Sequence, residues 1–278
     1  CIIPKLRGKY RSRPMENILR EARSLADSGA KELIVVAQDI TRYGMDLYGK
    51  PSLSELIREL AKTDKIEWIR LHYLYPDMID DELIRTVAEE PKVVKYLDIP
   101  IQHINDGILR AMNRRGSAED IEKLIGKLRS AIPGLVIRTS LITGLPGEGE
   151  KEFEELCDFL KRTELERAGV FAFSPQEGTP AFDMDRPDAE TAQRRAELLA
   201  DIQSRIMDRF NESRIGSETR VLAEEFDADG GCWYGRSWAD SPDVDGRVIF
   251  RGEDVKAGEF YDIRITGTAG GDLTGELI

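Results

Sequence analysis

The stretch Val136-Ile-Arg-Thr-Ser-Leu-Ile-Thr-Gly-Leu-Pro-Gly-Glu148 is followed by a helical pattern over Glu150–Lys161. A β-branched run that ends in glycines before an amphipathic helix is typical of a strand, a turn and a crossover helix. The same unit recurs up to about residue 175. Further apolar runs begin at Glu32, Glu67, Lys95 and Gly169, and further helical patterns cover Pro14–Ser28, Ser52–Ala61, Asp80–Glu89 and Ser117–Ala131. This alternation predicts an α/β fold with parallel strands and right-handed crossovers.

The residues at the starts of these helices agree with their boundaries. Ser52 precedes Glu55 and Ser117 precedes Asp120, which is the order of a capping box. Pro14 suits the first turn of a helix because its missing N–H would lack a helical partner there. The sequence therefore predicts where three helices begin.

Five strands in this order suit an open sheet or an incomplete barrel, and both place ligands at the carboxyl ends of the strands. Polar residues and a glycine follow three of the runs: Gln38 and Asp39, Gln102 and His103, and Thr143 and Gly144. We therefore expect a binding site at that edge of the sheet.

The pattern changes after a long helix over Asp188–Arg214. Short strands with Gly and Asp turns follow, at Thr219–Glu225, Cys232–Trp238, Arg247–Phe250, Phe260–Gly267 and Leu273–Ile278. Five strands in so short a segment predict a small closed barrel of the OB type. The expected domains are residues 1–213 and 214–278.

Charge and cysteine content limit the partners and the compartment. The chain has a net charge of −12, and residues 214–278 hold 14 acidic and 7 basic residues. Broad nucleic-acid affinity needs clustered cations, so an acidic barrel favours a basic protein partner instead. Three scattered cysteines do not suit a disulfide framework, which favours a reducing cytoplasm, and no apolar run is long enough to span a membrane.

The first residues carry a resemblance to a known family. Cys1 precedes Ile-Ile-Pro, Arg7-Gly8 and Ser12-Arg-Pro14, and this pattern resembles the methylthiotransferase branch of the radical S-adenosylmethionine (SAM) superfamily. The resemblance implies a partial TIM-like (β/α)6 barrel without its first strand, followed by a TRAM domain. It also implies that Cys1 is one of three ligands of a 4Fe–4S cluster, because thiolates suit such clusters. The other two cysteines, and a domain with a second 4Fe–4S cluster, would precede Cys1.

The same resemblance implies the residues that contact SAM. Gln38 and Asp39 match the position that binds the amino group, and Gln102 and His103 lie where the ribose and methionine are bound; His103 could equally be a core histidine. The segment Arg138-Thr139 to Thr143-Gly144 matches the glycine-bearing adenine turn, and Phe173 belongs to the next strand end. The basic segment Lys5–Arg13 could close over the cluster or remain a solvated loop.

The function implied is the addition of a methylthio group to the β-carbon of an aspartate in ribosomal protein S12, with an electron donor protein as a further partner. The continuation Thr41-Arg-Tyr-Gly44 and the acidic terminal barrel favour this branch. A MiaB-like tRNA methylthiotransferase and a non-catalytic module that docks a basic protein are the alternatives. For the tRNA alternative, Trp233, Tyr234, Trp238 and Phe260 would stack on bases; otherwise they belong to the barrel core.

Overall fold

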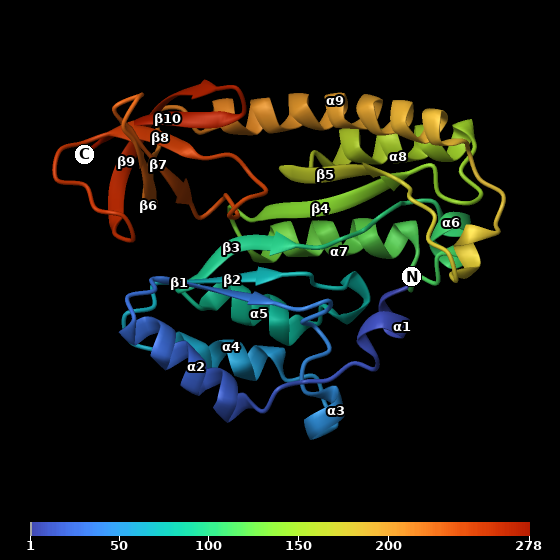
Figure 1. Ribbon diagram of the computed structural model, residues 1–278, viewed down its shortest axis with the longest axis horizontal. Helices are drawn as coiled ribbons and strands as arrows, with labels where there is room; N and C mark the ends of the chain where they lie inside the picture. Colours follow the sequence, from blue (N-terminus) through green and yellow to red (C-terminus); the bar gives the residue numbers. More distant parts are fainter. Residues whose placement is uncertain (1) are drawn as a thin grey trace.

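A parallel five-stranded sheet and a separate C-terminal barrel make up the chain, in a computed structural model that describes residues 2–278 (Figure 1). Its five strands run parallel, as the alternating pattern predicts, and lie in the order β1-β2-β3-β4-β5. Its strands are β1 (Glu32–Val36), β2 (Trp68–His72), β3 (Val93–Asp98), β4 (Val136–Thr143) and β5 (Arg167–Ala172).

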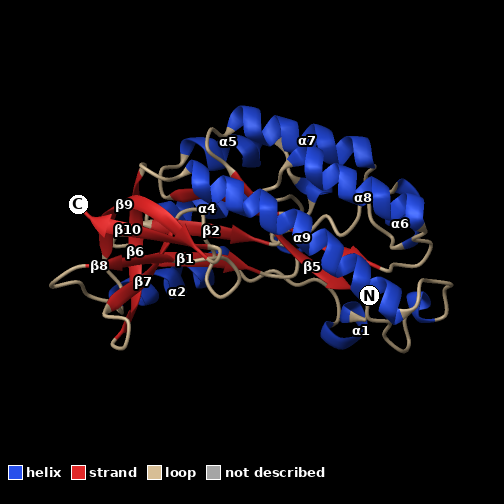
Figure 2. Cartoon of the chain, turned by 90° about the horizontal axis from the view of Figure 1, so that it is seen from above, coloured by secondary structure: helices blue, strands red, loops and turns tan. Residues whose placement is uncertain are grey.

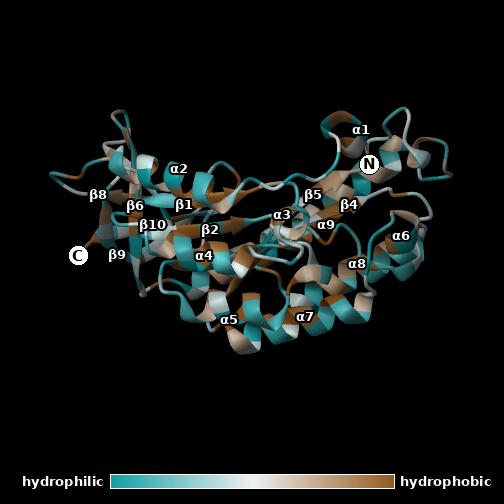
Figure 3. Cartoon of the chain, turned by 90° about the horizontal axis from the view of Figure 1, so that it is seen from below, coloured by the Kyte–Doolittle hydropathy of each residue, from teal (hydrophilic) through white to brown (hydrophobic). Residues whose placement is uncertain are grey.

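Helices α4, α5, α7 and α8 lie along one face of this sheet (Figure 2). The helices of this part are α1 (Ile3–Arg7), α2 (Met15–Asp27), α3 (Met45–Tyr48), α4 (Leu53–Ala61), α5 (Asp81–Glu89), α6 (Asp106–Ala111), α7 (Ala118–Ala131) and α8 (Glu150–Thr163), with 3-10 turns η1 (Pro76–Met78) and η2 (Pro180–Phe182). Hydrophobic and hydrophilic positions alternate along α5 and α7 (Figure 3), and the apolar side chains join one core with Ile57, Leu71 and Leu156. Among the described residues, no helix combines the length and apolar character that a membrane crossing needs.

The opposite face of the sheet is partly open at its two outer strands. Ile34 and Val36 on β1 and Phe171 on β5 are exposed there. The inner strand β2 is buried along nearly its whole length, as a central parallel strand must be.

The helix starts confirm one capping box and correct another. Ser117 and Asp120 bond to each other's backbone N–H in the predicted way. Ser52 makes no cap bond, because its hydroxyl donates instead to the carbonyl of Lys50 at 3.2 Å. Pro14 is the N-cap of α2, one position before the predicted first turn.

The long helix α9 (Ala189–Ser213) leads into the predicted closed barrel, whose strand order is β10-β8-β7-β6-β9. Its strands are β6 (Glu218–Asp227), β7 (Cys232–Ser237), β8 (Val248–Arg251), β9 (Phe260–Ala269) and β10 (Asp272–Leu277). Val221, Phe250 and Ile263 are almost fully buried in its centre. Alternation of inward apolar and outward polar residues explains why five such short strands close into a barrel.

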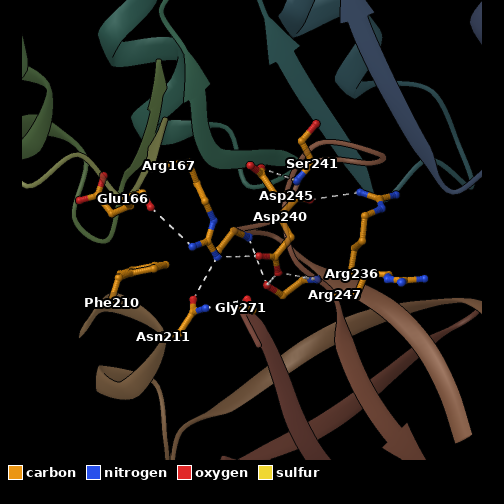
Figure 4. A network of polar contacts seen from close by, with 12 residues as sticks. Glu166, Arg167, Phe210, Asn211, Arg236, Asp240, Ser241, Asp245, Arg247 and Gly271 are labelled. Carbon is orange, nitrogen blue, oxygen red and sulfur yellow. Dashed lines mark hydrogen bonds and ion pairs between the residues drawn. The ribbon is translucent and has the colours of Figure 1, made fainter. Parts of the chain in front are cut away.

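The barrel packs against the amino-terminal ends of the sheet strands through buried ion pairs (Figure 4). Arg167 of β5 donates to Asp240 at 2.9 Å and to Asn211 of α9 at 3.1 Å. Glu32 of β1 accepts from Arg70 of β2 at 2.7 Å and from Arg236 of β7 at 2.6 Å. Each of these guanidinium groups thus has a carboxylate partner inside the interface, which satisfies the main requirement for burying it.

Further contacts extend the interface across β2, β3 and β9. Tyr96 donates its hydroxyl to Asp245 at 2.6 Å, and His72 contacts Ser241 at 2.9 Å. Trp68 packs edge-on against Phe260 with 4.6 Å between ring centroids.

The remaining aromatic residues named for base stacking are also partly covered. Trp238 packs against the apolar cluster at this interface, and Trp233 packs against the barrel core. Tyr234 is half-buried and lies under the guanidinium of Arg247. The reading of these four residues as packing residues therefore fits the structure better than a stacking platform.

Candidate functional site

The carboxyl ends of β1–β5 meet at the edge of the sheet that faces away from the barrel (Figure 1). Loops after β1, β3, β4 and β5 bring the sequence-predicted residues to this edge or to the strands that lead to it. The side chains divide into those with room for a ligand and those occupied by protein contacts.

After β1, Gln38 is exposed, whereas Asp39 is buried in a charged cluster. Asp39 accepts a hydrogen bond from the backbone N–H of Thr41 at 2.9 Å and pairs with Arg42 at 2.8 Å. Arg42 also pairs with Asp77, which follows β2, at 3.0 Å. Of the two residues expected to bind the SAM amino group, Gln38 is thus the one with a free approach.

After β3, Gln102 adopts a left-handed backbone with φ of 74°, which is uncommon for a residue with a side chain. Its backbone N–H and C=O bond to Ser140 and Ile142 of β4, both at 2.8 Å, and hold this conformation. The side-chain oxygen Oε1 is buried and has no partner among the described residues. A buried acceptor without a donor is costly, so it suits a ligand that donates a hydrogen bond.

His103 belongs to a buried polar group that links three elements. It is fully buried, and its Nδ1 accepts the backbone N–H of Asn105 at 3.0 Å. This bond leaves the ring hydrogen on Nε2, which lies 3.4 Å from Glu148. Glu148 also accepts from Gly144 and from Arg195 of α9, each at 2.9 Å. The structure favours the core-histidine reading of His103.

The pKa of Glu148 reflects these contacts. Burial alone would raise this pKa, but the contact with His103, the N–H of Gly144 and the guanidinium of Arg195 together lower it. The carboxylate is therefore ionised in the folded protein and joins the β4–α8 turn to α9. The sequence signal was available, since Glu148 closes the Gly-Leu-Pro-Gly-Glu stretch, but nothing marked Arg195 as its partner.

Two predicted SAM contacts on β4 are occupied by the protein itself. Arg138 lies toward the barrel and pairs with Asp98 at 3.1 Å. Thr139 is fully buried and donates its hydroxyl to the carbonyl of Ile99 at 2.8 Å. Both side chains therefore support the strand ends in this structure, and their contact with SAM stays a prediction.

The Thr143-Gly144 turn packs under α9. Thr143 donates its hydroxyl to the carbonyl of Ala192 at 2.8 Å. Gly144 has φ of 74°, and a Cβ placed on it would lie 2.3 Å from the Cβ of Ala192. Glycine is required here by helix packing, so the side-chain space at this turn is not available to a ligand.

A pocket of about 360 Å³ nevertheless lies beside this turn. Phe173 and Gly144 line it, together with residues 184–189, which lead into α9. An aromatic ring next to polar backbone suits a flat heterocycle such as adenine.

The three cysteines are the residues that could ligate the 4Fe–4S cluster implied by the family resemblance. Cys1 lies outside the described residues. Cys157 on α8 and Cys232 on β7 are buried free thiols on separate domains. Within residues 2–278, no group of three or more potential metal-ligating side chains comes together. The unpartnered oxygen of Gln102 and the pocket beside Gly144 suit a ligand such as SAM. The described residues do not by themselves provide the three thiolates of a cluster.

One group at the same edge was not predicted from the sequence. Arg114 lies after α6, with its guanidinium 4.9 Å from the centre of the Tyr75 ring. Together with Arg42 and Asp77 it lines a pocket of about 120 Å³. The adjacent arginines before the Ser117 cap were the only hint, and such pairs are common on surfaces.

Family models match both parts of the chain. Residues 1–160 match the radical SAM superfamily and residues 215–278 match the TRAM domain.

Curated relatives match the whole chain. The ribosomal protein uS12 methylthiotransferase RimO of Acetivibrio thermocellus is 48% identical over 100% of this chain and 62% of its own length. RimO of Geobacter sulfurreducens is 47% identical over 100% of this chain and 63% of that protein. The chain thus spans somewhat less than two thirds of the length of these relatives.

Solved structures agree on the fold. Coproporphyrinogen III oxidase (HemN) from Escherichia coli, described as a radical SAM enzyme, has a TM-score of 0.52 and 15% identity over 82% of this chain and 61% of that one. Streptococcus suis SuiB bound to S-adenosylmethionine has a TM-score of 0.50 and 16% identity over 72% of this chain and 43% of that one.

Proposed function

Because the chain belongs to the radical SAM superfamily, we propose that the whole protein is a RimO-type methylthiotransferase that modifies ribosomal protein uS12, the S12 protein named above, in the cytoplasm. Superfamily membership implies a 4Fe–4S cluster and SAM as cofactors. The observation that carries the proposal is the 48% identity to RimO along the entire chain, through both the sheet and the barrel.

The reaction proposed is the addition of a methylthio group to the β-carbon of an aspartate in uS12. When bound, the cluster and SAM would supply the radical chemistry needed to activate that carbon, and a second cluster and another SAM would supply the sulfur and the methyl group. An electron donor protein supplies the reducing equivalent.

The residues of this chain would then bind and orient SAM. Gln38 is exposed at the end of β1, and the unpartnered oxygen of Gln102 can accept a hydrogen bond from the amino group or a ribose hydroxyl. Phe173 offers its ring beside the Gly144 turn. Cys1 would provide one thiolate to the cluster.

The C-terminal barrel would bind the basic substrate protein. The ion pairs at the interface with the sheet engage three of its acidic residues and three of its basic residues: Asp240, Asp245, Glu259, Arg214, Arg220 and Arg236. The remaining barrel residues keep 11 acidic and 4 basic side chains, a net charge of −7. A surface of this charge attracts a Lys/Arg-rich protein and repels nucleic-acid phosphate.

A competition assay tests the proposal. The whole protein, reconstituted anaerobically, receives SAM, a reductant, uS12 and unmodified tRNA in one reaction, and both products are examined by mass spectrometry. We expect methylthiolated uS12 and unchanged tRNA. Cys1→Ala should abolish the product, whereas Cys157→Ala should retain it because Cys157 is a buried residue of the apolar face of α8. Modified tRNA with unmodified uS12 would overturn the assignment.

A further inference from the structure

Arg114 is a half-buried cation whose side chain has no ion pair or hydrogen bond among the residues that the structure describes. Its guanidinium instead stacks on Tyr75 at 4.9 Å. Burial lowers the pKa of Arg114, while the nearby Tyr75, Asp77 and Asp39 act in the opposite direction. Withdrawing a charge from water without giving it a partner is unfavourable even when the side chain is only half-buried, so such a group is poised to accept an anion.

The backbone holds Arg114 in this position. Asn113 after α6 has a left-handed φ of 55°, which asparagine tolerates better than most residues. The N–H of Arg114 then donates to the carbonyl of Leu109 at 2.8 Å. On the other side, Ser117 caps α7 with its capping box. Because both neighbours are anchored, the guanidinium is oriented before any ligand arrives.

The charged side chains around Arg114 carry a net charge of +1 when Arg114 itself is included. Arg42 is fully engaged, since it pairs with Asp39 at 2.8 Å and with Asp77 at 3.0 Å. Arg115 is 74% exposed and lies 4.0 Å from Asp77. Three arginines face two aspartates, so the group is balanced when one monovalent anion binds to Arg114.

The pocket lined by Arg114 lies at the carboxyl-terminal edge of the sheet and has room for a small anion. It has a volume of about 120 Å³ and is lined by loops that follow β1, β2 and β3, including Arg42, Tyr75 and Arg114. A guanidinium presents a planar fork that matches a carboxylate with two parallel hydrogen bonds. Of the reactants, the target aspartate and the amino-acid end of SAM both carry a carboxylate.

We propose that Arg114 is a carboxylate-binding residue and that its ligand is the side chain of the target aspartate. This inference rests on the proposed uS12 methylthiotransferase function. It makes Arg114 a specificity residue: an aspartate neutralises the half-buried guanidinium, whereas asparagine leaves it charged and unpaired.

The test is a binding comparison on the whole protein with two labelled uS12 peptides, one with the target aspartate and one with asparagine there. A charged hydrogen-bonded pair predicts that the native protein prefers the aspartate peptide by about 10- to 100-fold in Kd. Arg114→Met should bind both peptides equally, at the weaker level. Arg114→Lys should restore part of the preference because it keeps the charge. Arg110→Met, an exposed arginine on the adjacent α6, is the matched control and should keep the full preference.

SAM retention, measured by equilibrium dialysis of the same variants, separates the two sources of carboxylate. We expect Arg114→Met to retain SAM as the native protein does. Loss of SAM with an unchanged peptide preference would assign the site to the SAM carboxylate and overturn the proposal, as would a preference unaffected by Arg114→Met. A native protein that does not modify uS12 would refute the proposed function, which is a separate outcome.

Discussion

Asp240 is the acidic centre of the interface between the sheet and the C-terminal barrel, and its replacement by asparagine tests how the two parts are held together. It is 2% exposed and lies 2.9 Å from Arg167 and 3.8 Å from Arg214, both also buried. It also accepts hydrogen bonds from the hydroxyl and N–H of Ser237. Asn is nearly isosteric with Asp, so Asp240→Asn removes the charge and leaves the shape.

The expected cost follows from the two guanidinium groups left without a counter-ion. Breaking a buried ion pair by removing one partner costs about 3–5 kcal/mol. The pKa of Arg214 is already lowered by burial, and Asp240 is the group that opposes this effect, so loss of Asp240 affects both arginines. For a protein of this size such a loss lowers Tm by about 6 °C or more.

Urea unfolding followed by circular dichroism measures the change, with limited proteolysis as a second readout. Asp240→Asn should lower the free energy of unfolding by the stated amount and release a fragment cut near the end of α9. Asp229→Asn, an exposed carboxylate on the same barrel, is the control and should change stability by less than about 0.5 kcal/mol. A variant Asp240→Asn as stable as this control would refute the reasoning.

Two further predictions concern stability. Burial and then the charge of Arg70 lower the pKa of His72 to about 4, whereas the unfolded value is about 6.5. As the pH falls between these values, the unfolded state takes up a proton that the folded state does not, so the free energy of unfolding decreases. In urea unfolding, His72→Gln should therefore remove about 1–2 kcal/mol of the stability lost between pH 7 and pH 5. An unchanged pH profile would contradict this. Gly144→Ala should destabilise by about 1–3 kcal/mol more than Gly134→Ala, because both have φ of 74° but only Gly144 faces Ala192; equal melting temperatures would contradict this.

The order of strands and helices was predictable because each unit carries its own local signal. The β4 stretch combines a β-branched run, a glycine turn and an amphipathic helix, and the structure places all three as expected. Ser52 shows the limit of such signals: its spacing to Glu55 matches a capping box, yet the hydroxyl bonds to Lys50. Competition between nearby backbone acceptors decides this, and the sequence pattern does not record it.

The site was harder to predict because partners come from distant parts of the chain. Arg138 lies on β4 and pairs with Asp98 and, across the interface with the barrel, with Asp245, which no local pattern indicates. Gly144 matches a ligand-binding turn in sequence, although α9 residue Ala192 provides the physical reason for glycine. Arg114 was missed since its unpaired charge is visible only when the loops after β1, β2 and β3 are assembled.

The state of uS12 in cells tests the central claim most directly. Ribosomes from the native strain and from a strain lacking this gene are compared by mass spectrometry of uS12, alongside nucleoside analysis of total tRNA. We predict a methylthio group on one aspartate of uS12 that disappears on deletion and returns when the gene is restored, with tRNA unchanged. A uS12 that is identical in both strains, together with loss of a methylthio nucleoside from tRNA, would contradict the account.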